Sequence, residues 1–208
     1  MDVDLRQLAV LILLSIAVLI RLFAHQQAGG IQRDQSDGVA LEGGAVIAVG
    51  LRLVFLVGGL GGTIAWLISP DLIPGSIDLP AWAHWFGIAL AETGVVLLAA
   101  VHVALGVHFS GTLHLREDHQ LVRSGPYARI RHPMYTSFLL LFVGLSLVMA
   151  NVPLAVLMLS SQAWVIGWRL PIEEAQLADR FGHRWDEYRA GTGALVPTLS
   201  AGRRGSHR

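Results

Sequence analysis

The 208-residue chain contains no cysteine, no lysine and few charged residues of any kind. Without cysteine it can form neither disulfide bonds nor metal sites built from thiolates. Charged residues make up 14% of the chain, whereas a soluble domain usually has about 25%. The 15 arginines are balanced by 15 acidic residues, so the chain lacks the basic excess of a nucleic-acid-binding protein. These shortages leave little water-facing surface and favour a membrane protein.

Hydrophobic residues make up 53% of the chain and gather in five long segments. A helix needs about 20 mostly apolar residues to cross the hydrocarbon core of a membrane. The predicted spans are residues 8–23, 45–68, 82–107, 135–149 and 154–168, the last two forming a tight helical hairpin. The first span is longer than a signal-peptide core and no small-residue cleavage site follows it, so we interpret it as a retained anchor.

No glycine-rich GxGxxG loop follows a strand-like segment, so nothing indicates a Rossmann domain. The predicted fold is therefore all-α, a polytopic membrane helix bundle with about five transmembrane helices and a C-terminal amphipathic helix. We expect three parts: N-terminal helices 1–3 in residues 1–108, a core in residues 109–199 and a flexible tail in residues 200–208.

The distribution of arginine predicts the orientation of the bundle. Cytoplasmic loops of membrane proteins are enriched in arginine and lysine. Arginines cluster in residues 109–133 and in the C-terminal tail, whereas residues 70–81 contain none. We therefore expect the first two regions in the cytoplasm and, with five spans, the N-terminus outside, although Arg6 near the outer end does not follow the rule. The arginine-rich, lysine-free composition suggests a GC-rich bacterial genome and hence a bacterial inner membrane.

Two charged residues, Arg52 and Glu92, fall inside the second and third predicted spans. A charge at that depth is costly and usually either pairs or lines a polar cavity. The sequence leaves both readings open: the two residues pair and hold two helices together, or they line a substrate channel.

Polar residues in specific patterns gather in residues 109–133 and 171–197. In the first stretch, Gly125 and Pro126 predict a turn, and Pro133 suits the first position of a helix. Arg131 and His132 then lie at a helix entrance, where exposed backbone N–H groups favour an anion.

In the second stretch, Glu173 and Glu174 follow Pro171 at the predicted end of the fifth span. Apolar residues then recur at spacings of four, four and three, at Leu177, Phe181, Trp185 and Tyr188. This pattern predicts one face of an amphipathic helix on the membrane or on the bundle. The glutamates either stabilise the start of that helix through its dipole or accept hydrogen bonds from a ligand.

The two stretches resemble the isoprenylcysteine carboxyl methyltransferase family and, more broadly, the phospholipid methyltransferases. The matching motifs are HQLV (119–122), GPY (125–127), RHPMY (131–135), EEAQL (173–177), FG (181–182) before Tyr188, and a closing Pro197. Order and spacing hold from about Phe109 to Leu199, whereas the first three spans carry no comparable motif. One departure is Ser137, where the family commonly has glycine; serine keeps close helix packing but changes the substrate cavity.

The resemblance implies an S-adenosylmethionine-dependent methyltransferase without a metal, its pocket lying between the last helices and facing the cytoplasm. The cofactor-binding residues that it implies are His119, Leu121, Val122, Gly125, Tyr127, His132, Tyr135 and Glu174. It implies catalytic or substrate-contacting roles for Arg131, Glu173 and Arg169. The acceptor would be a lipophilic small molecule or lipidated substrate that enters from the bilayer. A carboxylate is the favoured acceptor, either isoprenylcysteine-like or another isoprenoid or lipid acid.

Other functions remain open at this stage. A phospholipid or amine N-methyltransferase would need a base for its acceptor, and Glu173 would be available. A sterol-reductase-like enzyme using NADPH shares RHPMY but not HQLV or the spacing from EE to FG. A di-iron oxidase would use His102, His108, His114 and His119, but their intervals of five or six residues do not place ligands on one helical face. A non-enzymatic scaffold leaves the two motif-rich stretches unexplained.

Overall fold

The computed structural model describes residues 4–27, 57–105 and 121–198, and over these residues the protein is helical, as predicted. The long helices are α1 (Leu5–Gln27), α3 (Ala81–Leu105), α4 (Pro133–Met149) and α5 (Val152–Phe181). The other helical elements are α6 (His183–Gly191), the short 3-10 helices η1 (Pro70–Leu72) and η3 (Gly125–Ala128), and the segment Val57–Ile68. Two isolated β-bridges, Ser76 to Asn151 and Ile130 to Gly193, are the extended pairings in this part of the chain.

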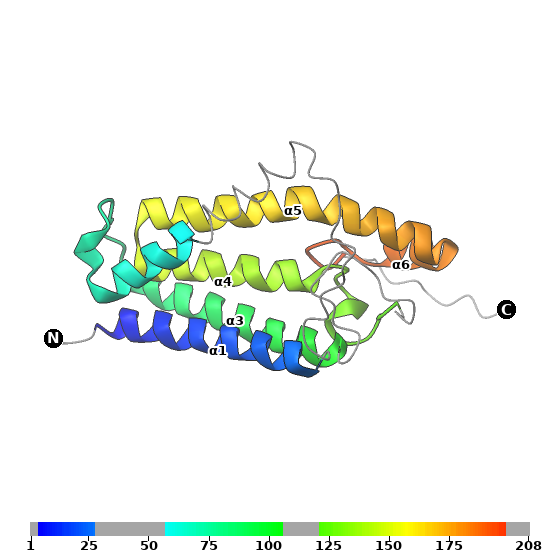
Figure 1. Ribbon diagram of the computed structural model, residues 1–208, viewed down its shortest axis with the longest axis horizontal. Helices are drawn as coiled ribbons and strands as arrows, with labels where there is room; N and C mark the ends of the chain where they lie inside the picture. Colours follow the sequence, from blue (N-terminus) through cyan, green and yellow to red (C-terminus); the bar gives the residue numbers. More distant parts are fainter. Residues whose placement is uncertain (1–3, 28–56, 106–120, 199–208) are drawn as a thin grey trace.

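The long helices lie side by side along the long axis of the molecule (Figure 1). The closest packing is between α3 and α4, and it depends on small residues. A Cβ atom on Gly144 would lie 2.5 Å from the backbone nitrogen of Ala91 and 2.5 Å from the carbonyl oxygen of Gly87. A Cβ atom on Gly94 would lie 2.7 Å from the carbonyl oxygen of Ser137. Glycines at such contacts let two helix backbones approach closely, as is common in membrane bundles.

The core of the bundle is apolar and joins all the long helices. It includes Val10 and Leu13 of α1, Leu98 of α3, Leu145 of α4 and Trp66 of the segment before η1, each at most 5% exposed. Many large hydrophobic side chains instead point outward. Examples are Leu19 on α1 and Val96 and Val103 on α3, at 62%, 68% and 83% exposure. Outward-facing apolar surface of this extent fits apolar surroundings rather than water.

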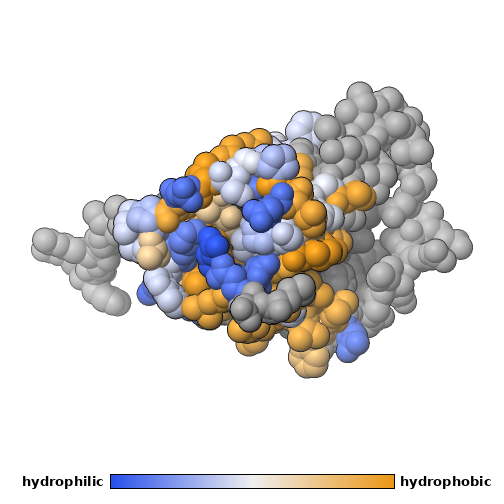
Figure 2. Space-filling view, turned by 90° about the vertical axis from the view of Figure 1, so that its left-hand side faces the viewer, coloured by the Kyte–Doolittle hydropathy of each residue, from blue (hydrophilic) through white to orange (hydrophobic). Residues whose placement is uncertain are grey.

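Within the described residues, two helices are long and apolar enough to cross a membrane, Leu5–Ala24 and Ala81–Leu105, in line with the first and third predicted spans. Val57–Ile68 and Pro133–Met149 are shorter apolar helices. Figure 2 looks onto the end of the molecule at the left of Figure 1 and shows hydrophilic residues gathered there, with hydrophobic residues around them. At that end, the side chain of Arg6 pairs with Asp4 at 2.6 Å.

The predicted hairpin between the fourth and fifth spans is present. Ala150 adopts a left-handed conformation (φ 47°) that ends α4. Asn151 begins α5, because its side-chain oxygen accepts a hydrogen bond from the backbone N–H of Leu154 at 3.2 Å. The same side chain donates to the carbonyl oxygen of Ile73 at 3.0 Å, which fastens the loop before α3 to the hairpin.

The predicted end of the fifth helix and the separate amphipathic helix were wrong. Helix α5 continues through Pro171 to Phe181, so Glu173 and Glu174 lie inside a helix of 30 residues and not at a helix start. A proline inside a helix removes one backbone donor and crowds the preceding turn, but here the helix continues beyond it. The chain breaks at Gly182 instead, where φ is 48°. Leu177 and Phe181 therefore belong to α5, whereas Trp185 and Tyr188 belong to α6.

Glu92 lies on the outer side of α3, in a groove against α1 that is otherwise lined by apolar residues such as Leu8 and Ile16. Arg52 lies outside the described residues, so the pairing of these two charges stays a prediction.

Candidate active site

The polar motifs meet at the end of the bundle that carries α6, at the right of Figure 1. The segment after α6 fixes the backbone of RHPMY. The N–H of Arg131 donates to the carbonyl oxygen of Gly193 at 2.8 Å, and the N–H of His132 donates to that of Ala194 at 2.9 Å. His132 is the residue before the first turn of α4 and Pro133 is the first residue of that turn, as predicted. The side chains of this motif are thus presented from a rigid backbone.

Arg131 joins α5 and α6 through its guanidinium group. Its Nε and Nη2 donate to Glu174 Oε1 at 3.1 and 2.9 Å. Its Nη1 donates to the carbonyl oxygens of Thr192 and, at 3.2 Å, of Arg189. The group also lies 6.0 Å from the centre of the Trp185 ring. With only 9% of the side chain exposed, these contacts suit a residue that positions Glu174 and closes α6 onto the bundle.

The two glutamates of α5 face the entrance of α4. His132 Nε2 lies 3.3 Å from Glu174 Oε1, and its Nδ1 lies 3.7 Å from Glu173 Oε2. The Tyr135 hydroxyl donates to Glu173 Oε1 at 2.7 Å, and Arg169 Nη2 lies 3.4 Å from the same oxygen. With Arg131, the structure therefore brings together six of the residues predicted for the site, from two parts of the chain about 40 positions apart.

The electrostatics of the cluster follow from its burial and its charges. Burial lowers the pKa of His132 below its ordinary range, and the nearby carboxylates of Glu173 and Glu174 only partly oppose this. Burial alone would raise the pKa of Glu174, but the hydrogen bonds and charge of Arg131, helped by His132, outweigh it and lower that pKa. At neutral pH the cluster thus holds a neutral imidazole beside an ionised carboxylate.

The GPY motif covers the end of α3. Gly125 has φ +57°, and a Cβ atom there would lie 3.3 Å from Cβ of Ala104. The Tyr188 hydroxyl of α6 donates to the carbonyl oxygen of Tyr127 at 2.7 Å. Burial raises the pKa of Tyr188 to about 12, so this donor keeps its proton. Tyr127 and Gly125 are in this way joined to the α6 end of the cluster.

Other predicted residues lie further out or outside the described residues. Leu121 and Val122 are half-buried and lead into the GPY turn. His119 lies outside the described residues, so its predicted contact with the cofactor stays a prediction. His108 and His114, predicted ligands in the di-iron alternative, also lie outside the described residues.

Sequence reasoning missed several residues that support the site. Gln162 of α5 is buried, and its side-chain amide donates to the carbonyl oxygen of Tyr135 at 3.2 Å. A glutamine inside an apolar span was a usable signal, because polar residues at that depth usually have a partner. Thr192 and Arg189 contribute backbone carbonyl oxygens, which no side-chain pattern reveals.

The charged side chains of the cluster suit the amino-acid end of S-adenosylmethionine, which carries an ammonium and a carboxylate. The carboxylates of Glu173 and Glu174 can accept from an ammonium group. Nε of Arg169 is buried and, within the described part of the chain, has no hydrogen-bond partner. A buried donor without a partner is unusual in a folded protein, and a ligand carboxylate would satisfy it.

Comparison with known proteins agrees with the sequence motifs. Residues 82–184 match the family of phospholipid methyltransferases. These 103 residues, just under half of the chain, are similar to this family. The match runs from the first turn of α3 to the start of α6 and includes the Arg131, His132 and Glu174 cluster. The resemblance inferred from RHPMY and EEAQL is thereby confirmed.

Similar proteins include two protein-S-isoprenylcysteine O-methyltransferases of Arabidopsis thaliana. Form B is 30% identical over 122 residues, covering 57% of this chain and 61% of the relative. Form A is 29% identical over 140 residues, covering 66% and 70%. A protein-S-isoprenylcysteine O-methyltransferase of Tribolium castaneum is 25% identical over 148 residues, covering 70% of this chain and 52% of the relative. The chain thus spans about three fifths of the length of the first of these relatives.

The fold is similar to that of a eukaryotic intramembrane Ras methyltransferase, an isoprenylcysteine carboxyl methyltransferase. The TM-score is 0.54 at 20% sequence identity, with 92% of this chain and 68% of that chain covered. The similarity extends beyond the motif-bearing half and shows that the bundle as a whole has the fold of an intramembrane enzyme.

Proposed function

We propose that this protein is an integral membrane methyltransferase that transfers a methyl group from S-adenosylmethionine to the carboxylate of a lipophilic acceptor. The observation that carries the proposal is the cluster of His132, Tyr135, Glu173 and Glu174. It forms at one end of an apolar bundle, within a segment similar to isoprenylcysteine O-methyltransferases.

Five helices cross the membrane in this proposal: α1, the helix that includes Val57–Ile68, α3, α4 and the first half of α5. Arginine marks the site end of the molecule, at Arg169, Arg184 and Arg189, and the opposite end carries Asp71 and Asp78. By the positive-inside rule, the site faces the cytoplasm of a bacterial cell and the N-terminus lies outside.

Each residue of the cluster has a defined task toward the methyl donor. When bound, the donor supplies an electrophilic methyl group on a positively charged sulfur. Glu174, held ionised by Arg131, and Glu173, held by Tyr135, accept hydrogen bonds from the donor's ammonium group. Arg169 offers its buried Nε to the donor's carboxylate. A neutral His132 would add no positive charge to a site that is to hold a cationic donor. Leu121, Val122, Gly125 and Tyr127, with His119, line the rest of the pocket.

A carboxylate acceptor suits this site better than an amine. A carboxylate is already nucleophilic and needs no base, whereas an ammonium must first lose a proton. Both glutamates are already held by donors, Glu174 by Arg131 and Glu173 by Tyr135 and Arg169. Their oxygens are thus engaged in contacts that compete with accepting a proton from an ammonium group. The relatives' names supply the acceptor class, the carboxylate of an isoprenylated cysteine or a similar isoprenoid acid.

The chain accelerates the transfer mainly by alignment and by excluding water. Holding acceptor oxygen, methyl carbon and sulfur in line converts a bimolecular step into an effectively unimolecular one. The transfer also removes two opposite charges, so a dry site of low polarity favours it. The apolar bundle surface around α4 supplies such surroundings.

Calorimetry on the detergent-purified protein tests the proposal. S-adenosylmethionine and its demethylated product should each bind saturably, and NADPH should not. Binding of NADPH alone would favour the reductase, and binding of none of the three would favour a scaffold. The matched variants are His132→Ala, which should abolish donor binding, and His183→Ala, which changes an exposed histidine of α6 and should leave it intact.

A further inference from the structure

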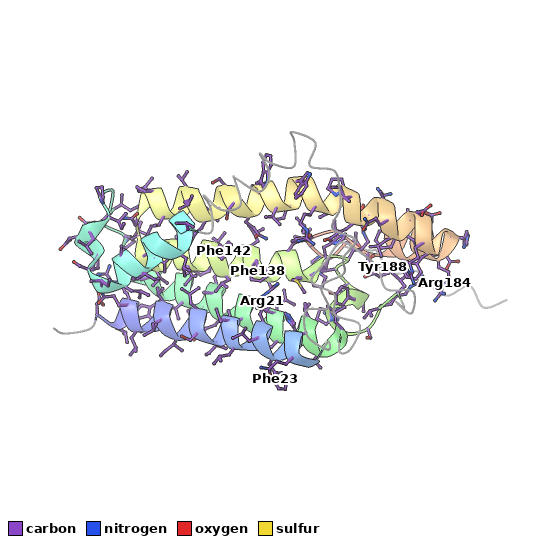
Figure 3. The ribbon with its side chains drawn as sticks, viewed as in Figure 1. Arg21, Phe23, Phe138, Phe142, Arg184 and Tyr188 are labelled. Atoms are coloured by element: carbon purple, nitrogen blue, oxygen red, sulfur yellow. The ribbon has the colours of Figure 1, made fainter. Side chains whose placement is uncertain are left out.

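Arg21 of α1 points into the bundle, whereas Leu22 and Phe23, which follow it, point outward. Its guanidinium carbon lies 5.5 Å from the centre of the Phe138 ring, and its Nη1 lies 3.9 Å from the sulfur of Met134. Figure 3 shows Arg21 between α1 and Phe138 of α4, whereas Phe23 points away from the bundle. The positive-inside rule alone accounts for an arginine at this end, but it does not account for a side chain turned toward α4.

No carboxylate in residues 4–27, 57–105 or 121–198 lies within 4.0 Å of Arg21. A half-buried guanidinium without an anion beside it is unfavourable, because it has lost part of its hydration. An anionic group on a ligand would offset that cost.

We propose that Arg21 binds the carboxylate of the methyl acceptor, so that α1 completes a site whose other walls are α4 and α5. This proposal rests on the proposed function. Arg21 reaches α4 at Met134 and Phe138, in the first two turns of the helix, which also carry Tyr135 of the cluster. Phe138 lies 6.1 Å from Phe142, ring centre to ring centre, and these rings give the apolar chain of the acceptor a surface beside its charged end.

Such a site distinguishes substrate from product. In the transfer, one oxygen of the acceptor carboxylate forms a bond to the methyl carbon while the carbon–sulfur bond breaks and its electron pair stays on sulfur. The acid becomes a neutral ester, and the positively charged donor becomes neutral as well. Arg21 then loses its charged hydrogen bonds to the acceptor. The residue thus favours binding of the acid and release of the ester.

A binding experiment with two ligands tests this role without relying on turnover. The ligands are N-acetyl-S-farnesylcysteine, which has a free carboxylate, and its methyl ester. Their dissociation constants are measured on detergent-purified protein by tryptophan fluorescence, together with that of S-adenosylmethionine. Because both ligands enter micelles, the informative quantity is the ratio of ester to acid dissociation constants. In the wild-type protein this ratio should be well above one.

The Arg21→Gln variant should bind the acid about 10-fold or more weakly and the ester as before, because a charged hydrogen bond is lost. S-adenosylmethionine affinity should not change. Arg6→Gln is the matched control, an arginine of the same helix that is paired with Asp4 at the opposite end. It should leave all three dissociation constants unchanged. If Arg21→Gln does not fold, Arg21→Lys replaces it and should lower the ratio several-fold, since lysine lacks the two-pronged donor geometry.

Three results would overturn the proposal. Equal loss of acid and ester affinity would show that Arg21 only shapes the cavity. Weaker S-adenosylmethionine binding with unchanged acid binding would assign Arg21 to the donor's carboxylate. Unchanged binding of every ligand would show that Arg21 contributes to binding none of them. In each case, retained S-adenosylmethionine binding and esterification by the wild-type protein would leave the proposed function intact.

Discussion

Replacing Glu174 by glutamine removes the charge at the centre of the cluster while keeping its shape. Glu174 Oε1 accepts two hydrogen bonds from Arg131, at 3.1 and 2.9 Å, and lies 3.3 Å from His132 Nε2. A glutamine side chain can still place an oxygen at that point. It cannot offer a negative charge to Arg131, whose side chain is 9% exposed, or to the ammonium group of a bound methyl donor.

The expected loss of affinity for the methyl donor follows from a hydrogen bond whose acceptor oxygen is charged in Glu174 and neutral in glutamine. A hydrogen bond to a charged group contributes about 1.5–3 kcal/mol, against about 0.5–1.5 kcal/mol for a neutral one. For the bond between the donor's ammonium group and residue 174, the difference is about 1–1.5 kcal/mol. Because about 1.4 kcal/mol corresponds to tenfold, the affinity for S-adenosylmethionine should fall roughly 5- to 10-fold if the cluster holds the donor.

Isothermal calorimetry on the purified variant measures this change. Glu187→Gln is the matched control, because Glu187 lies on α6, is 59% exposed and forms an ion pair with His183. It should bind the donor with wild-type affinity. An unchanged dissociation constant for Glu174→Gln, in a protein that elutes as the wild type does on gel filtration, would refute the role given to this carboxylate.

Three further predictions concern pH, packing and the membrane charges. The lowered pKa of His132 means that the unfolded chain binds a proton that the folded protein does not. Stability should therefore be highest above the ordinary histidine pKa and fall as pH drops from that value to the lowered one, whereas donor affinity should fall as pH drops through the lowered one; a chemical-denaturation series in which His132→Gln shows the same slope would contradict this. Gly144→Ala should lower the unfolding temperature by several degrees, because its Cβ would lie 2.5 Å from backbone atoms of α3, while Gly167→Ala, with open space, should not. Arg52→Leu combined with Glu92→Leu should destabilise the protein less than the sum of the single changes if the two charges pair; thermal stability that falls by the full sum would show that no pair exists.

The site illustrates what the sequence could and could not predict. The identity of the site residues was accessible, because RHPMY and EEAQL carry unusual polar residues at the edges of apolar spans. Their pairing was not accessible, since Arg131 and Glu174 are 43 positions apart and only the packing of α4 against α5 decides which oxygen faces which donor. The carbonyl oxygens of Thr192 and Arg189 are invisible to any side-chain pattern.

Helix boundaries show the same limit. Ala81–Leu105 was predictable within a few residues, because its apolar run is continuous and proline precedes it. The end of α5 was not, because Pro171 is a strong signal for a helix end and the polar residues after it resembled a new helix. The actual break depends on the positive φ of Gly182 and on the burial of Trp185 beside Arg131. That burial is a tertiary contact that overrides the local signal.

Methyl transfer itself is the most direct test of the central claim. Purified protein is mixed with S-adenosylmethionine carrying a labelled methyl group and with N-acetyl-S-farnesylcysteine, and the product is identified by mass spectrometry. The account predicts a labelled methyl ester that mild base hydrolyses back to the acid, and none with His132→Ala. Label that resists base, or that appears in phosphatidylethanolamine offered in parallel while the farnesylated acid stays unmodified, would contradict a carboxyl methyltransferase.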